Sequence, residues 1–153
     1  MTHATEQMGA FVVEGKIDLP ATFSVGAVAS RFFIEIRDNR RIMGLRCPEC
    51  NRVYVPPRAT CKRCFGQLSE WVEVSDKGTL LAYAIAYQPN PAQPVDTPIV
   101  YGIVQLDGAD TGLVHLLSEV DFERLKVGLR LQTVFKEKRV GNILDIKYFR
   151  PLR

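Results

Sequence analysis

The chain has 153 residues, of which 46% are apolar and 24% charged, and its net charge is +3. This composition is that of an ordinary globular protein with one domain of average size, or with a small module joined to a larger one. The net charge is too small to indicate a nucleic-acid partner by itself, and no apolar run is long enough to span a membrane.

Residues 1–24 are predicted to form an N-terminal extension without a core of its own. The segment carries one strand-like run, Phe11-Val12-Val13, and Pro20 interrupts the chain after it. The first residues have neither the basic region nor the apolar region of a secretory signal peptide. A cytoplasmic location is therefore expected.

Residues 25–40 are predicted to contain a helix, with a helical pattern from Val25 to Asp38. Apolar residues recur at spacings of four, three and four, which mark one face of a helix: Val25, Ala29, Phe32 and Ile36. Phe33 and Ile34 fall outside that face, so the helix is apolar on more than one side. Such a helix is either deeply buried or shared with another chain, and we expect Phe32, Phe33 and Ile34 to contact a partner.

Two Cys-x-x-Cys pairs dominate residues 41–70, the predicted zinc ribbon. They are Cys47-Pro48-Glu49-Cys50 and Cys61-Lys62-Arg63-Cys64, and they contain every cysteine of the chain. The residues between the pairs allow a short β-excursion, in which Val53-Tyr54-Val55 returns and Pro56-Pro57 ends the strand. We therefore expect Cys47, Cys50, Cys61 and Cys64 to form a tetrahedral site for a structural Zn²⁺ ion.

Other uses of the four cysteines are less favoured. Two disulfides would require an oxidising compartment, and a thioredoxin-like redox site would require one Cys-x-x-Cys pair rather than two. Iron stays open as an alternative metal, because four cysteines also suit a rubredoxin-type centre. Asn51 and the Phe65-Gly66 pair follow the two knuckles, where the backbone tends toward left-handed conformations that Gly and Asn tolerate best.

Residues 71–153 are predicted to be all β. Runs rich in Val, Ile, Leu, Tyr and Phe, separated by turn sequences, indicate successive strands: Trp71–Val74, Gly78–Tyr87, Ile99–Leu106, Leu113–Ser118, Leu129–Phe135 and Ile143–Phe149. A short helical piece is predicted over Asp121–Leu125, between the third and fourth barrel strands. Five strands with a helical insert in that place are typical of an OB-fold. The predicted fold class is therefore mainly β, with an N-terminal helix, a zinc ribbon and a five-stranded OB-fold barrel.

The basic residues are concentrated in one part of the chain. Between Arg31 and Cys64 lie nine basic and three acidic residues, whereas the remainder carries eleven basic and fourteen acidic residues. The segment therefore has a net charge of +6 and the remainder −3. Such a segment is either a solvated face or a docking site for phosphate groups or an acidic partner.

The order of these parts resembles a known family. The motifs that carry the resemblance are Ser30-Arg31-Phe32-Phe33, Arg46-Cys47-Pro48-Glu49-Cys50, Val55-Pro56-Pro57-Arg58, Cys61-Lys62-Arg63-Cys64, Trp71, Gly78-Thr79-Leu80 and Val127-Gly128. Together they resemble the domain-of-unknown-function family that joins a rubredoxin-like zinc ribbon to an OB-fold, and the resemblance covers about residues 24–151. The chain departs from the family pattern at Asn51, where Gly is usual, and at Phe65, which precedes Gly66.

The resemblance implies a function. Members of that family resemble small accessory subunits of thiolase-superfamily enzymes, including thiolases and hydroxymethylglutaryl-CoA synthases, and related modules are similar to parts of acyl-CoA hydratase assemblies. It implies a zinc-binding subunit that is not an enzyme by itself. Such a subunit would form a hetero-oligomer with a β-ketoacyl-CoA thiolase or a related enzyme and would help to bind or channel acyl-CoA. Anaerobic degradation of aromatic compounds is the pathway that the resemblance suggests.

An acyl-CoA ligand would need basic residues for its phosphates, because Arg and Lys match phosphate oxygens. Five residues of the basic segment are the candidates: Arg40, Arg41, Arg58, Lys62 and Arg63. Phe32, Tyr54 or Trp71 would offer a shelf for the adenine ring.

No residue pattern indicates catalysis by the chain itself. A thiolase acylates a cysteine, and a metal site that takes all four cysteines leaves none. His115 lies within a strand-like run without a Ser or Cys partner nearby in the sequence, so a structural role is expected. Four acidic residues cluster in the barrel loops, where turns select Asp for backbone reasons: Asp107, Asp110, Glu119 and Asp121.

Two other functions stay open. Zinc ribbons and OB-folds both occur in proteins that bind single-stranded nucleic acid, but the negative net charge outside the basic segment counts against that function. The other is a metal-stabilised scaffold that binds no ligand.

Overall fold

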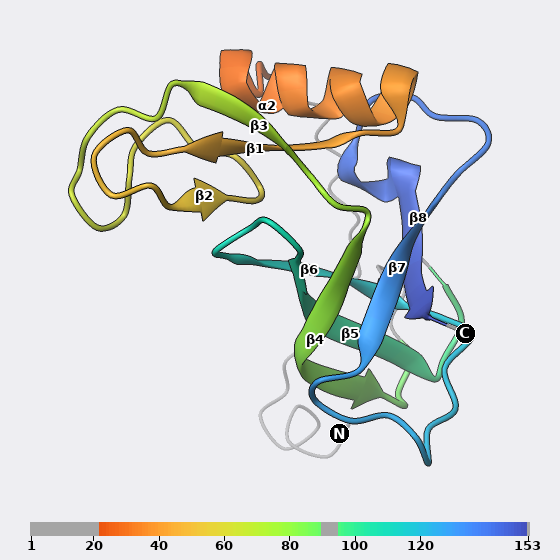
Figure 1. Ribbon diagram of the computed structural model, residues 1–153. Coiled ribbons are helices and arrows are strands. Elements are labelled where there is room, and N and C mark those ends of the chain that lie inside the picture. The colour runs from red at the N-terminus through yellow and green to blue at the C-terminus, as the bar shows by residue number, and fades with distance from the viewer. Residues whose placement is uncertain (1–21, 90–94, 153) are drawn as a thin grey trace, which may run out of the picture.

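A helix lies across a small sheet, and the two together cap one end of a β-barrel (Figure 1). The computed structural model describes residues 22–89 and 95–152. The predicted strand-like run Phe11–Val13 lies outside the described residues. Within them, the fold is mainly β, as predicted.

The helix α2 (Gly26–Ile34) continues as one π-helical turn (Glu35–Asn39), which ends at Arg40 in a left-handed conformation with φ 54°. Phe32 and Ile36 lie on the predicted apolar face, and both are buried in the core. The prediction of a helix over Val25–Asp38 is therefore confirmed to within a residue at each end.

The ribbon sheet consists of three short antiparallel strands in the order β2-β1-β3. They are β1 (Ile42–Arg46), β2 (Val53–Tyr54) and β3 (Glu70–Val74). β1 is the central strand, so Leu45 pairs with Tyr54 on one side and with Trp71 on the other. The domain boundary predicted after residue 70 stays a prediction, but β3 crosses it and pairs within the ribbon sheet over its whole length.

The barrel consists of β4 (Lys77–Ala86), β5 (Ile99–Leu106), β6 (Gly112–Leu117), β7 (Arg130–Phe135) and β8 (Ile146–Pro151). It closes in the order β4-β5-β6-β8-β7, and β7 pairs with β4. All neighbours are antiparallel except β6 and β8, which form a single parallel pair, Leu117 with Phe149. The closed five-stranded barrel confirms the predicted OB-fold.

Gly78 opens the first barrel strand because two backbones meet there. It pairs with Leu106 on one side and with Leu131 on the other. A Cβ atom at this position would lie 2.4 Å from the carbonyl oxygen of Gln105. Only glycine fits this close approach, which gives a physical reason for the Gly-Thr motif at the start of the barrel.

Two predicted elements differ in the structure. The helical piece over Asp121–Leu125 is wrong: the segment is a turn, in which Asp121 accepts hydrogen bonds from the N–H groups of Glu123 and Arg124. An Asp side chain that binds the backbone two residues on favours a turn over a helix. The last strand begins at Ile146 rather than Ile143, because a capping box between Asn142 and Asp145 folds the first three residues into a 3₁₀ turn.

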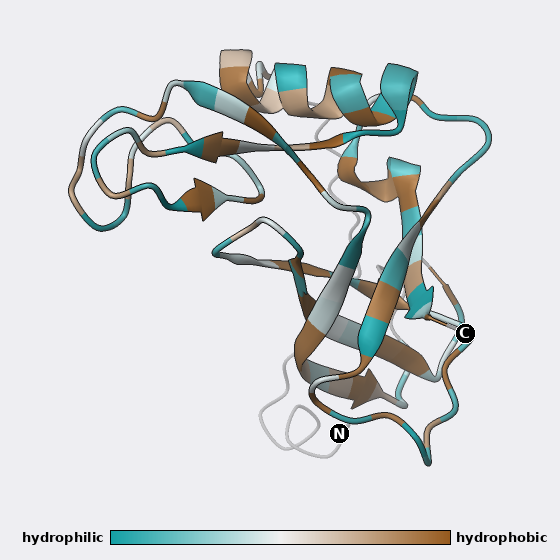
Figure 2. Ribbon diagram, viewed as in Figure 1, coloured by the Kyte–Doolittle hydropathy of each residue, from teal (hydrophilic) through white to brown (hydrophobic). Residues whose placement is uncertain are grey.

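A single core joins the helix, the ribbon and the barrel. Phe32 and Ile36 from the helix pack in the same buried cluster as Val53 and Val55 from the ribbon and Phe149 from the barrel. Figure 2 shows the hydrophobic segments that the barrel strands and β2 contribute. A second, smaller cluster surrounds the cysteines and contains Leu45, Cys47, Tyr54, Cys61 and Leu68. The shared core makes the ribbon part of the folded unit rather than an independent appendage.

Candidate metal centre

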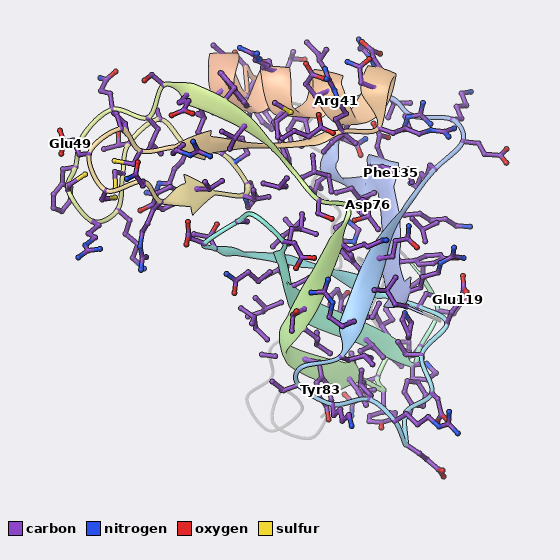
Figure 3. The ribbon with its side chains drawn as sticks, in the orientation of Figure 1. Arg41, Glu49, Asp76, Tyr83, Glu119 and Phe135 are labelled. Atoms are coloured by element: carbon purple, nitrogen blue, oxygen red, sulfur yellow. The ribbon has the colours of Figure 1, made fainter. Side chains whose placement is uncertain are left out.

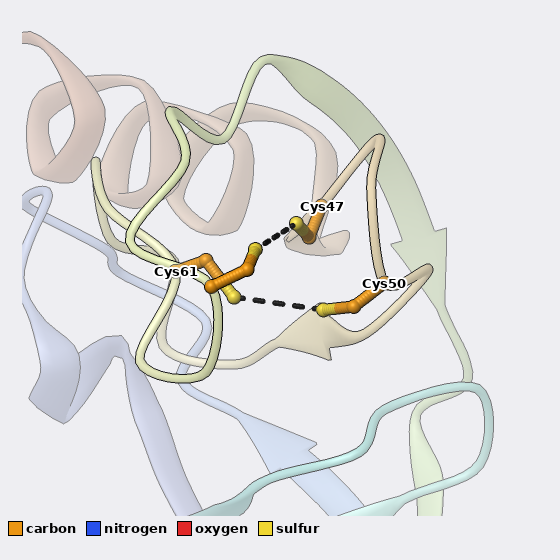
Figure 4. Close-up of side chains that lie close together, drawn as sticks. Cys47, Cys50 and Cys61 are labelled. Atoms are coloured by element: carbon orange, nitrogen blue, oxygen red, sulfur yellow. Dashed lines mark hydrogen bonds between the residues drawn. The ribbon is translucent and has the colours of Figure 1, made fainter.

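The four cysteine sulfurs converge on one point between the two knuckles. All four Sγ atoms lie within 4.8 Å of one another. Cys47 Sγ lies 3.4 Å from Cys64 Sγ, and Cys50 Sγ lies 3.6 Å from Cys61 Sγ (Figure 4). A tetrahedral zinc ion with ordinary Zn–S bonds would separate its sulfurs by about 3.8 Å. The donor set therefore fits one tetrahedral ion, and the predicted convergence of the two pairs is confirmed.

Matching backbone turns build the two knuckles. The carbonyl oxygen of Cys47 accepts from the N–H of Asn51 at 2.9 Å, and that of Cys61 accepts from the N–H of Phe65 at 3.1 Å. Asn51 and Phe65 both adopt left-handed conformations, with φ 58° and 60°. The left-handed residue of the second knuckle is thus Phe65 and not the glycine after it, because Phe65 stands at the position that corresponds to Asn51.

Tyr54 supports the sulfur of Cys61 from the ribbon strand β2. Its hydroxyl accepts a hydrogen bond from the N–H of Lys62 at 3.1 Å and lies 3.3 Å from Cys61 Sγ, to which it can donate its proton. The Arg63 N–H also points at this sulfur, at 3.4 Å. The pKa of Cys61 is lowered to about 5, mainly because the Tyr54 hydroxyl donates a hydrogen bond to its thiolate. A buried tyrosine thus favours the thiolate form that binds a metal.

The neighbouring thiols oppose ionisation of the fourth cysteine. Although the Gly66 N–H favours the Cys64 thiolate, the thiols of Cys47 and Cys61 outweigh it and raise the pKa of Cys64 to about 12. Thiols this close cannot all be ionised without a cation between them. The electrostatics of the site therefore match a cage that a divalent ion completes.

The five basic residues predicted to hold CoA phosphates fall into two groups. Arg40 and Arg41 precede β1, whereas Arg58, Lys62 and Arg63 lie in the ribbon loops beyond its other end. Figure 3 shows this separation in the positions of Arg41 and of Glu49, which lies in the first knuckle. Arg41 is already paired, at 2.8 Å with Glu35 and at 3.6 Å with Glu73. The structure does not bring the five residues together in one cluster.

Two of the three ribbon residues contact Tyr54. The guanidinium of Arg58 lies over the Tyr54 ring, 5.7 Å from its centroid, and the Lys62 N–H donates to the Tyr54 hydroxyl. The side chains of Arg58, Lys62 and Arg63 are exposed. Lys62 and Arg63 lie within the second knuckle and Arg58 lies three residues before it, and we call these three residues the basic ribbon surface.

The side chains predicted as a shelf for adenine are not free. Phe32 and Tyr54 are 2% and 3% exposed, so neither ring offers a face to a ligand. Trp71 is covered by Arg31, whose guanidinium lies 4.6 Å from the ring centroid. The burial of Phe32 also contradicts its predicted contact with a partner. That contact stays a prediction for Phe33, which is half-buried, and for Ile34, which is 45% exposed.

Among the exposed aromatic residues, one beside the metal centre was not predicted as a contact for a partner. Phe65 is 80% exposed at the end of the second knuckle, next to the basic ribbon residues. The sequence offered one signal for this exposure, which is that Phe65 departs from the family pattern with a large apolar side chain just after the second knuckle. Aromatic side chains are the type that most often dominates binding energy at protein interfaces.

His115 is buried inside the barrel, as its predicted structural role requires. Its Nε2 lies 3.2 Å from the carbonyl oxygen of Ile143, and its ring meets the Phe149 ring edge-on at 5.9 Å. Burial lowers the pKa of His115 and keeps it neutral. Within the described residues, the four cysteines are the only cluster of His, Cys, Asp and Glu that could hold a metal ion. None of the helices in that part of the chain is long and apolar enough to cross a membrane.

Two family models match consecutive parts of the chain. The model of the ChsH2 rubredoxin-like zinc ribbon domain matches residues 35–69, and that of the ChsH2 C-terminal OB-fold domain matches residues 71–136. Similar solved structures include the "Ltp2-ChsH2(DUF35) aldolase", with a TM-score of 0.61, 24% identity and coverage of 84% of this chain and 98% of that one. A DUF35 protein of unknown function from Sulfolobus solfataricus has a TM-score of 0.59 at 24% identity, over 71% of this chain and 78% of that one. At this identity, the structures show a common fold.

The chain is also similar to several curated proteins. A "DUF35 domain-containing scaffold protein" from Pyrococcus furiosus is 28% identical over 127 residues, which are 80% of this chain and 92% of the relative. The protein of the same name from Methanocaldococcus jannaschii is 24% identical, over 80% and 89%. A "probable enoyl-CoA hydratase alpha subunit" from Thermomonospora curvata is 28% identical over 78% of this chain, which spans only 36% of that protein. With its four-cysteine ribbon followed by a closed five-stranded barrel, the chain belongs to the ChsH2-type family of DUF35 proteins, which join a rubredoxin-like zinc ribbon to an OB-fold.

Proposed function

We propose that the protein is a non-catalytic, zinc-containing accessory subunit that docks on a catalytic subunit of an acyl-CoA enzyme of the thiolase type. The geometry of the metal centre carries the proposal. Catalytic zinc sites keep one position for water or substrate, whereas a site with four thiolates is closed and structural. Iron would fit the same four ligands, but an iron site of this kind serves electron transfer and would need a redox partner. A structural role requires only zinc, which has no redox chemistry.

A metal site that takes all four cysteines leaves no thiol for covalent catalysis, which supports a role without chemistry. The four metal ligands are the only cysteines of the chain. His115 is 6% exposed inside the barrel, too deeply buried to reach a substrate. A chain of this kind contributes binding and positioning, while a partner supplies the reacting groups.

The names of the relatives support the accessory role and the class of partner. Two relatives are named scaffold proteins, and a third is named as a subunit of a probable enoyl-CoA hydratase. In the third, the region similar to this chain is about a third of a longer protein. A similar fold occurs in the "Ltp2-ChsH2(DUF35) aldolase". The choice of a thiolase-type partner rests on the family resemblance of the sequence motifs.

The basic ribbon surface is the part of the chain that we propose to contact CoA. Arg58, Lys62 and Arg63 are exposed in and before the second knuckle, and Arg forks and Lys ammonium groups bind phosphate oxygens well. Arg41 is the weakest of the sequence candidates, because Glu35 and Glu73 already occupy its guanidinium. Phe65 and Ile34 are exposed apolar side chains on the ribbon and the helix, and we propose them as anchors for the partner.

Affinity purification of the tagged protein from its own cells tests the proposal. The co-eluting proteins are identified by mass spectrometry. Bound nucleic acid is measured in the same eluate and compared with an eluate treated with nuclease. We expect a stoichiometric thiolase-type or other acyl-CoA enzyme subunit in the eluate. Recovery of RNA, DNA or polymerase components without such a subunit would contradict the proposal and favour the single-strand-binding function.

A further inference from the structure

A cavity of about 470 Å³ lies on the outside of the barrel, where β6 meets β8. None of its lining residues belongs to the helix or the ribbon. Ile99, Leu116 and Leu117 line it with buried apolar side chains, and Leu144 adds a half-exposed one. A concave apolar site of this size is within the range that holds small molecules.

The cavity exists because two irregularities of the barrel coincide. β6 and β8 form only one parallel pair, Leu117 with Phe149, so the barrel wall is barely joined there. In β8 the pairing with β7 also shifts register, since Phe135 pairs with Ile146 and Val134 with Tyr148. Lys147 is therefore the extra residue of a β-bulge, a feature that often redirects a side chain.

The bulge brings two polar side chains to the cavity together. Ile146 and Phe149 are both fully buried, so the two residues between them, Lys147 and Tyr148, both lie outside the core. Both line the cavity. The Tyr148 hydroxyl is held by Glu119 at 2.6 Å, on the side of the barrel where Figure 3 marks Glu119. The Lys147 Nζ lies 5.4 Å from the centroid of the Tyr148 ring.

The polar edge of the cavity has an excess of positive charge. Lys136 and Lys147 both line it, and Asp96 is its one carboxylate. Among residues 22–89 and 95–152, no carboxylate forms a salt bridge with either lysine, whereas several arginines are paired. The two ammonium groups are therefore available to a ligand that enters the apolar space beside them.

We propose that this cavity binds a small amphiphile with an apolar body and an oxyanion head, either a carboxylate or a phosphate. The apolar body replaces water against Leu116, Leu117 and Ile99, and the head lies between Lys136 and Lys147. Asp96 repels an anionic head, but the two lysines outnumber it, so the net charge of the lining favours an anion. This binding site is separate from the metal centre and from the basic ribbon surface, and it does not depend on the proposed partner.

The test uses the isolated full-length protein and three probes that share one apolar chain: octanoate, octyl phosphate and 1-octanol. Binding is followed by two-dimensional amide NMR, with the shifts of Leu116, Leu117 and Ser118 as the readout. We expect saturable shifts at these residues with at least one of the anions, and the tighter of the two identifies the head group. The double variant Lys136→Gln/Lys147→Gln should weaken anion binding by roughly five- to tenfold.

Lys138→Gln is the matched control, because Lys138 is exposed on the same segment and does not line the cavity. It should bind the anions as the unmodified protein does. The proposal is overturned if neither anion gives saturable shifts at the cavity, if 1-octanol binds as tightly as the anions, or if the double variant binds them unchanged. Folding of the variants is checked by their spectra without probe.

Discussion

The carboxylate of Asp110 accepts a hydrogen bond from the backbone N–H of Val53 at 2.8 Å, and the N–H of Asp110 donates to the carbonyl of Val53 at 2.9 Å. Asp110 lies in the turn between β5 and β6, and Val53 begins the ribbon strand β2. The next residue repeats the arrangement, since the Thr111 hydroxyl accepts from the Val55 N–H at 2.8 Å and donates to its carbonyl at 2.9 Å. β2 is an edge strand of the ribbon sheet, and the turn between β5 and β6 binds the backbone groups on its free side. These hydrogen bonds fix the metal ribbon on the barrel.

Replacing Asp110 with alanine should loosen this junction. Asp110→Ala leaves the Val53 N–H without its acceptor, and we expect the free energy of unfolding to fall by about 1–2 kcal/mol. Urea denaturation followed by circular dichroism measures the change. Glu123→Ala is the control, because no hydrogen bond or ion pair of its side chain is known within the described residues, and it should change stability by less than about 0.5 kcal/mol. Equal stabilities of the two variants would show that the junction contributes nothing.

Loss of one thiolate should release the metal and unfold the ribbon. Cys47 and Cys61 are buried in the cluster that surrounds the site, so Cys47→Ser or Cys61→Ser removes a ligand that nothing nearby replaces. Because a structural zinc supplies folding free energy, we expect both variants to lack stoichiometric zinc and to melt at a lower temperature. Metal analysis and thermal melting measure this. Lys62→Gln, an exposed change inside the second knuckle, should keep metal and stability, and a serine variant that kept both would rule out the four-thiolate site.

The Tyr54 hydroxyl should strengthen metal binding without being a ligand. Tyr54→Phe removes the hydrogen bond to Cys61 and leaves the Lys62 N–H without its acceptor. Outer-shell changes of this kind cost about ten- to a hundredfold in metal affinity, and we expect the lower end of that range. Competition with a coloured chelator measures the zinc affinity. Tyr83→Phe is the matched control, because the Tyr83 hydroxyl donates to the carbonyl oxygen of Leu125 in the barrel, away from the metal centre. An equal loss of zinc affinity in both variants would count against the role of Tyr54.

Stability should fall below neutral pH because of His115. Burial lowers the pKa of this histidine in the folded state, so the unfolded chain binds the proton more readily. The contribution of neutral His115 to the free energy of unfolding is complete above the pKa of histidine in the unfolded chain, about 6.5. It is lost as the pH falls from that value through the lower pKa of the folded state. Urea denaturation at several pH values between about 7.5 and 5 measures the slope. His115→Gln should be less stable at neutral pH but should show a smaller slope; an unchanged slope would assign the pH dependence to other groups.

Exposed apolar residues of the helix and the ribbon should anchor the partner. Ile34→Glu or Phe65→Asp changes a side chain that is 45% or 80% exposed, so neither should unfold the protein. We expect each variant to recover at least tenfold less of the catalytic subunit in affinity purification, as is typical of the central contacts of an interface. Val127→Glu is the matched control, because Val127 is 61% exposed in the loop before β7. If the recovery of the catalytic subunit falls equally in all three variants, Ile34 and Phe65 are not specific anchors.

The metal centre and the strands could be predicted because their signals are local in the sequence. Two Cys-x-x-Cys pairs fix the geometry of two sulfurs each, and Pro56-Pro57 ends the excursion between them. The barrel strands are also local signals, because runs rich in Val, Ile, Leu, Tyr and Phe are separated by turn sequences. The prediction of a helix at Asp121–Leu125 is wrong because so short a segment does not reveal that the Asp121 side chain binds the backbone two residues on.

The parts that could not be predicted depend on contacts between distant residues. Asp110 and Val53 meet because the turn between β5 and β6 lies against β2, and Tyr54 reaches Cys61 only because β2 folds back beside the second knuckle. Arg31 of the helix lies over Trp71 of the ribbon strand β3, forty residues further along the chain. Phe32 shares the apolar face of the helix with Ile36, and only the position of the barrel decides that this face is buried and not shared with a partner.

The most direct test of the accessory role is the turnover of acyl-CoA by reconstituted components. The zinc-loaded chain and the catalytic subunit recovered with it are purified separately and assayed alone and together, with Cys47→Ser as the metal-free comparison. The account predicts no turnover by the chain alone, and higher turnover by the catalytic subunit when the unmodified chain is added, with no gain from Cys47→Ser. Turnover by the chain alone, or a catalytic subunit that neither binds the chain nor responds to it, would contradict the account.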